Sequence, residues 1–133
     1  MIVRSKVNKK ACDSIKNFEK RKEVRLNKGI FSKVKTGDMI IFFDKSDPSP
    51  GYGVRVTGTK SYMSFAEMLE YEGMESVLPG RGFQSHKEAI DSFYRLSPIN
   101  YTQEKEDKFG IVVIHFVREW LKLLMIINYI DNQ

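Results

Sequence analysis

The sequence predicts a small α+β domain built around a curled β-sheet. Its 133 residues suffice for one domain over residues 1–133, because two separate hydrophobic cores would be difficult to build from so short a chain. Hydrophobic residues make up 41% and charged residues 29%, which is typical of a globular protein and excludes disorder and low-complexity arrays. The predicted order is one helix, several strands, two helices and a final strand. This order argues against alternating βαβ units.

The first predicted element is a short amphipathic helix within residues 8–20. Ala11, Ile15 and Phe18 are spaced by four and three residues, so we expect them on one buried face. Cys12 lies beside this stripe and is expected to be a small core residue.

Three strands are predicted in the middle of the chain, at residues 22–26, 39–43 and 53–62. In the first, the charged residues Glu23 and Arg25 alternate with apolar ones, which predicts a strand with one charged side. The second strand (MIIFF) is apolar throughout. The Pro- and Gly-rich segment between the last two strands cannot form a regular ladder and is expected to be a loop.

Two further helices are indicated by capping boxes. Ser64 is followed three residues later by Glu67, and Ser85 is followed in the same way by Glu88. The run at 109–116 (FGIVVIHF) is too continuously apolar for a half-exposed strand, so it predicts a central one.

Residues 117–133 form a C-terminal extension. Their apolar side chains recur at spacings of three and four, which predicts an amphipathic helix formed by Trp120, Leu123, Leu124 and Ile127. Such a helix would cap the open end of the barrel or, alternatively, form a homodimer interface. The longest uninterrupted apolar run, 123–127, is too short to cross a bilayer, so no membrane partner is expected.

Positive charge is concentrated at the N-terminal end. Residues 1–36 contain 12 basic and 3 acidic residues and carry +9, whereas the remainder contains 10 basic and 14 acidic residues and carries −4. A local positive potential orients a protein toward a polyanion, most commonly nucleic acid. The alternative is a solvated lysine-rich surface without a partner.

Several classes of protein are disfavoured. A single cysteine excludes an internal disulfide and a Cys-rich zinc site, and it suits a reducing compartment. No export signal is visible, so we expect a cytoplasmic protein, with the nucleus as the alternative intracellular location. His86 and His115 lack a second ligand at metal spacing, and no glycine-rich phosphate loop is present. We therefore expect neither a metal nor a cofactor.

The segment 20–25 (KRKEVR) carries the functional prediction. It places Lys20 at the end of the predicted helix, and Glu23 and Arg25 side by side on one face of the next strand. A K-x-x-E-x-R sequence followed about a dozen residues later by a Gly-Asp turn and an apolar strand resembles the ASCH (activating signal cointegrator homology) domain, a PUA-like family. The resemblance covers residues 6–116 and continues through Thr36-Gly37-Asp38, MIIFF, Tyr62-Met63-Ser64-Phe65, Leu78-Pro79-Gly80, Tyr101 and the strand at 109–114.

The resemblance implies a PUA-like small curled β-barrel flanked by short helices, with a cleft where Lys20, Glu23 and Arg25 gather. Members of the family are expected to bind single-stranded RNA or a modified nucleoside. The cluster suits this purpose, because cations keep the carboxylate ionised and the group offers donors and acceptors to a base and charge to a phosphate. Tyr62 and Tyr101 are the candidates for stacking on an unpaired base. The alternative is an ion-paired strand that only rigidifies the barrel.

An enzymatic function is the second hypothesis. The bacterial acetylcytidine amidohydrolases, one branch of the family, use a lysine, a threonine and a glutamate, and the resemblance places Lys20 at the lysine and Glu72 at or beside the glutamate. The threonine position is Glu23, which cannot replace a hydroxyl nucleophile without changing the chemistry. As a general base Glu23 would need a raised pKa, whereas adjacent cations lower it. Another branch has been linked to ribonuclease activity, although no acid–base pair of histidines is evident for RNA cleavage here.

Overall fold

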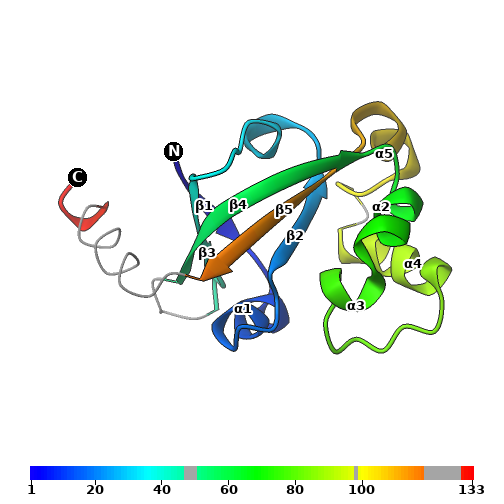
Figure 1. Cartoon of the computed structure of the whole chain (residues 1–133), viewed down its shortest axis with the longest axis horizontal. Coiled ribbons are helices and arrows are strands. Elements are labelled where there is room, and N and C mark those ends of the chain that lie inside the picture. The colour runs from blue at the N-terminus through cyan, green and yellow to red at the C-terminus, as the bar shows by residue number, and fades with distance from the viewer. Residues whose placement is uncertain (47–50, 98, 119–129) are drawn as a thin grey trace.

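A curled five-stranded sheet, a half-barrel, forms the centre of the molecule (Figure 1). The computed structural model describes residues 1–46, 51–97, 99–118 and 130–133. The strand order is β1-β3-β4-β5-β2, in which β1 pairs parallel with β3 and all other neighbours are antiparallel. The strands are β1 (Ile2–Lys6), β2 (Lys22–Leu26), β3 (Met39–Phe43), β4 (Tyr52–Tyr62) and β5 (Ile111–Arg118).

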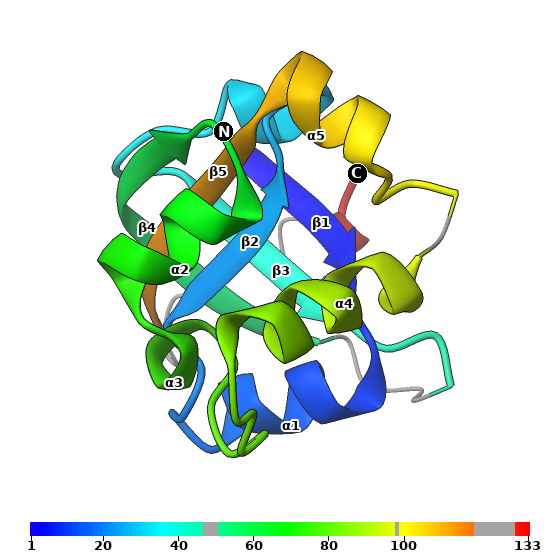
Figure 2. The same cartoon turned by 90° about the vertical axis from the view of Figure 1, so that its right-hand side faces the viewer.

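Short helices cover one side and one end of this sheet. Figures 1 and 2 show α2 to α5 gathered on one side, with α1 at the lower end of the sheet. The helices are α1 (Lys9–Lys16), η1 (a 3₁₀ helix, Gly29–Ser32), α2 (Phe65–Glu72), α3 (Met74–Val77), α4 (His86–Leu96) and α5 (Gln103–Phe109). The fold is thus α+β, a PUA-like half-barrel flanked by short helices, as predicted.

Two apolar clusters lie on opposite faces of the sheet. Because side chains alternate along a strand, β5 sends Val112 and Ile114 into one cluster and Ile111 and Val113 into the other. The first cluster also contains Ile40, Phe42, Val54 and Val56 from β3 and β4. The second joins β2 and β5 to the helices through Phe65, Met68, Leu69, Val77, Ala89 and Phe93.

Several local predictions are confirmed. The strands expected at 22–26 and 39–43 have these bounds, and β4 begins one residue earlier than expected. Both capping serines accept the predicted hydrogen bonds, since the Oγ atoms of Ser64 and Ser85 lie 3.1 Å from the backbone N atoms of Glu67 and Glu88. These features were predictable because they depend on local sequence alone.

The first helix is shorter than predicted. It ends at Lys16, and Phe18 adopts a φ of +63°, a left-handed conformation that cannot continue a helix. The Phe18 side chain is about half exposed (52%), so the prediction that it packs in the core is wrong, whereas Ile15 and Cys12 are buried as expected.

The last strand begins two residues later than predicted. Phe109 is the final residue of α5, and Gly110, with a φ of +70°, separates the helix from β5. A Cβ atom on Gly110 would lie 2.7 Å from the carbonyl oxygen of Tyr62, so a side chain there would clash with the backbone. The sequence reading also missed β1, η1, α3 and α5, which are short and carry weak patterns.

The helix predicted for the C-terminal extension falls largely on residues 119–129, which lie outside the described residues. Val117 and Arg118, assigned to that extension, are instead the last residues of β5. Within the described ranges, each helix is too short or too polar to traverse a lipid bilayer.

Candidate functional site

Arg25 connects the two outer strands of the half-barrel. From β2 its Nη2 atom donates to Ser5 Oγ (3.0 Å) and to the Lys6 carbonyl oxygen (3.3 Å) at the end of β1. The guanidinium also lies over the Phe31 ring, 4.6 Å from its centroid. These contacts hold the side chain in place at the seam between β1 and β2.

Beside Arg25 lies a buried carboxylate. Glu23 Oε1 is 3.3 Å from Lys20 Nζ, and Oε2 is 3.2 Å from Arg25 Nη2. The Glu23 side chain is only 9% exposed, and this burial raises its pKa; the Lys20 and Arg25 cations more than offset it, so the pKa lies below the ordinary value. The carboxylate is therefore ionised at neutral pH, with two cations in place.

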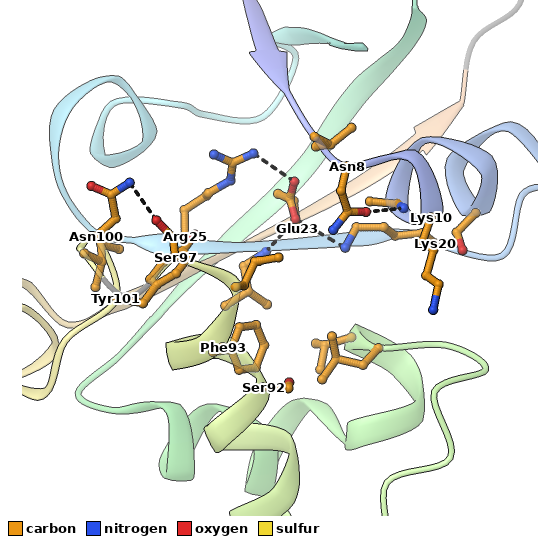
Figure 3. A pocket seen from close by; sticks show the side chains of 18 of the residues that line it. Asn8, Lys10, Lys20, Glu23, Arg25, Ser92, Phe93, Ser97, Asn100 and Tyr101 are labelled. Carbon is orange, nitrogen blue, oxygen red and sulfur yellow. Dashed lines mark hydrogen bonds and ion pairs between the residues drawn. The ribbon is translucent and has the colours of Figure 1, made fainter. Parts of the chain in front are cut away.

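The cluster lines a cavity of about 610 Å³. Among the described residues of the lining, the only carboxylate is that of Glu23, and six cationic side chains line the cavity with it: Lys6, Lys10, Lys20, Arg25, Lys28 and Arg81. All of them except Arg81 come from the basic N-terminal segment. In Figure 3, Lys10 and Lys20 lie at one end of the cavity, Glu23 in the middle, and Arg25, Asn100 and Tyr101 at the other end. Cavities of this size accommodate small ligands or single nucleotides.

The facing wall is apolar and comes from the helices. Val77, Leu78 and Pro79 line it at the end of α3, and Phe93 and Leu96 line it from α4. Sequence reasoning did not assign these residues to the site. Helical periodicity identifies the apolar face of α4, but only the tertiary fold brings that face opposite β2.

Two predicted site residues belong to a different cluster, on the opposite face of β2. Glu72, at the end of α2, accepts a hydrogen bond from the Tyr62 hydroxyl and has its Oε1 2.9 Å from Lys22 Nζ and 3.0 Å from His115 Nε2. Its side chain is 3% exposed. The structure thus brings Lys20, Glu23, Arg25 and Tyr101 together along one cavity and separates Tyr62 and Glu72 from them.

The protonation equilibria of this second cluster reflect its burial. Burial and the hydrogen bond to Glu72 raise the pKa of Tyr62 to about 12. Burial also lowers the pKa of His115, and nearby Glu72 only partly opposes this. For Glu72, burial raises the pKa, but the Tyr62 and Lys22 hydrogen bonds and the nearby His115 outweigh it and lower the pKa overall. At neutral pH Glu72 is therefore ionised, with the Lys22 ammonium and the His115 ring beside it.

Among the described residues, no group of three His, Cys, Asp or Glu side chains is arranged to hold a metal ion. The cavity instead offers cationic donors, one anionic acceptor, neutral amide and hydroxyl groups, and aromatic rings. This combination can bind an anion that carries a polar ring.

Fold and site together define a PUA-like domain with a cationic cavity beside its strand seam. The family model of the ASCH domain matches residues 6–119, so the chain belongs to the ASCH domain family. A search of curated proteins finds no match.

Solved structures also resemble the chain. The hypothetical protein PH0355 is 33% identical, with a TM-score of 0.76, and the match covers 90% of this chain and 100% of that one. Protein PF0455 from Pyrococcus furiosus is 35% identical, with a TM-score of 0.69 and coverage of 89% and 97%. An ASCH domain from Lactobacillus crispatus JV V101 is 18% identical, with a TM-score of 0.47 and coverage of 88% and 79%.

Proposed function

We propose that this ASCH domain binds single-stranded RNA or a modified nucleoside in the cavity beside β2. The observation that carries the proposal is the lining, in which six cationic side chains stand against the single buried carboxylate of Glu23. An excess of cations around a cavity of ligand size favours an anionic ligand over a neutral or cationic one.

The centre of the cavity supplies groups suited to a nucleobase. The ionised carboxylate of Glu23 accepts hydrogen bonds, while Lys20 and Arg25 beside it donate them. Tyr101 lines the same cavity and offers an aromatic ring. Single-stranded RNA is recognised through such groups, because its unpaired bases expose both their edges and their faces.

Amide hydrolysis of an acylated cytidine remains the alternative, and Lys20 beside Glu23 in a cavity of ligand size is what favours it. Two observations weigh against it. Glu23 has a lowered pKa, which makes it a weak general base, and Glu72 is bonded to Lys22, His115 and Tyr62 on the other face of β2. Incubating the protein with acetylated cytidine tests this alternative, and acetate release that requires Lys20 would support it.

RNA binding is tested by fluorescence anisotropy with a labelled single-stranded RNA at several salt concentrations. Lys20→Ala and Arg25→Ala should each weaken binding several-fold and reduce the salt dependence, because each removes a cation from the binding surface. Circular dichroism of each variant establishes that it is folded.

Lys87→Ala is the matched control. Lys87 lies on α4 with its side chain 86% exposed and pairs with Asp91, so its loss removes the same charge without altering the cavity. If the two cavity variants bound RNA with the affinity and salt dependence of Lys87→Ala, the proposal would be rejected.

A further inference from the structure

We infer that the cavity has two subsites, and that its ligand is a phosphorylated nucleotide unit and not a bare nucleoside. The base would lie at the end formed by Arg25, Asn100 and Tyr101, and the phosphate at the end formed by Lys10, Lys20 and Arg81. The inference rests on the proposed function and specifies which chemical form of the ligand the cavity selects.

The base end combines an aromatic ring, an amide and the Arg25 guanidinium. The Asn100 amide donates to Ser97 Oγ (2.9 Å), which fixes the side chain and leaves its carbonyl oxygen as an acceptor. Tyr101 meets Phe65 edge to face at a centroid distance of 5.9 Å, so its ring orientation is held by the core. Arg25 uses Nη2 for its contacts with Ser5, Lys6 and Glu23, which leaves Nη1 and Nε as further donors. This end can both stack on a base and form hydrogen bonds to it.

The phosphate end gathers cations from three separate segments. Lys10 comes from the first turn of α1, Lys20 precedes β2, and Arg81 lies in the loop between α3 and α4; in Figure 3 the ribbon of this loop passes on the same side as Lys10 and Lys20. Lys20 contacts Glu23 with one of its three donor protons, so two remain for a ligand. The carboxylate lies in the middle of the cavity and keeps Lys20 directed inward.

Because the two ends are separate, the cavity should select a nucleotide over a nucleoside. A neutral nucleoside can satisfy the base end but brings no anion to Lys10, Lys20 and Arg81. A monophosphate carries a charge of about −1.5 to −2 near neutral pH and would meet all three. Charge-assisted hydrogen bonds to phosphate oxygens are stronger than neutral ones, so the phosphate should contribute a substantial share of the affinity.

The test is a calorimetric titration of the full chain with the four ribonucleosides and with their 5′- and 3′-monophosphates. At low salt, at least one monophosphate should bind about 10-fold more tightly than its nucleoside, which corresponds to about 1.4 kcal/mol. In the double variant Lys10→Ala/Arg81→Ala this ratio should fall to about 3 or less. The control Lys33→Ala/Lys87→Ala removes two exposed charges outside the cavity lining and should keep the ratio.

The outcomes separate this inference from the proposed function. Three outcomes would overturn the two-subsite arrangement and leave the proposed function standing. The nucleoside and the monophosphate could bind with equal affinity, or a protein that binds RNA could show no measurable monophosphate binding. The ratio of monophosphate to nucleoside affinity could also persist without Lys10 and Arg81. If RNA binding did not depend on Lys20 and Arg25, the proposed function itself would be rejected.

Discussion

Two buried carboxylates lie on opposite faces of β2, and their surroundings differ. Glu23 contacts two cations that come from its own segment, and all three side chains line a cavity. Glu72 contacts Lys22, His115 and Tyr62, which come from three different strands, and connects them to the end of α2. The first cluster leaves donors available to a ligand, whereas the second uses its groups to join sheet and helix. The same strand thus carries the proposed binding groups on one face and a network that joins sheet and helix on the other.

The largest expected effect is a loss of stability in a variant that breaks the second cluster. Glu72→Ala leaves Lys22, His115 and the Tyr62 hydroxyl without their shared acceptor. Removing one partner from a buried ionic network destabilises a protein strongly, and because Lys22 and His115 are partly exposed we expect a loss of about 2 to 4 kcal/mol in the free energy of unfolding. Urea denaturation measures it.

The matched change is Glu70→Ala on the exposed side of the same helix, which should alter stability by less than about 0.5 kcal/mol. A Glu72→Ala protein as stable as Glu70→Ala would show that the second cluster does not hold the sheet and helix together.

The next prediction compares two tyrosines that sequence reasoning treated alike. Tyr101→Leu should weaken RNA binding by about 1 to 3 kcal/mol, the range measured for stacking of a base on an aromatic ring. Tyr62→Leu should lower stability through the lost Glu72 hydrogen bond and leave the affinity of the folded protein unchanged. Anisotropy titrations under conditions where both variants are folded distinguish them. Equal losses of affinity would mean that Tyr62 also contacts the ligand.

The sequence predicted the cavity cluster because its geometry is local. Lys20, Glu23 and Arg25 lie within six residues, and alternation along one strand is enough to place the last two side by side. Their role in RNA binding stays a prediction. The structure also confirmed the strand at 22–26 and the serine caps, which depend on equally short-range patterns.

The remaining features depend on long-range packing. Tyr62 was grouped with the cavity as a candidate for stacking on a base, and Glu72 through the resemblance to the amidohydrolases. One partner of Glu72 is Lys22, fifty residues away, whose side chain points to the opposite face from Glu23. The apolar wall contributed by Phe93 and Leu96 was missed for the same reason, because it depends on long-range packing. A local pattern shows which side of an element is apolar, and only the fold determines what that side meets.

The smallest expected effect concerns how the contribution of Glu23, the carboxylate of the cavity, to stability changes at low pH. The pKa of Glu23 is lowered in the folded protein by Lys20 and Arg25, despite burial, which raises it. Its contribution to stability is therefore present above the ordinary glutamate pKa and is lost as the pH falls through the lower folded value. Glu23→Gln should cost about 1 kcal/mol at pH 7, the usual value of a hydrogen bond, and the difference from the native protein should shrink below pH 4.5. Glu19→Gln, at an exposed position just before Lys20, is the control and should follow the native curve throughout. Urea denaturation at a series of pH values measures these differences, and a Glu23→Gln deficit that stays constant or grows toward low pH would mean that the two cations do not hold this carboxylate ionised.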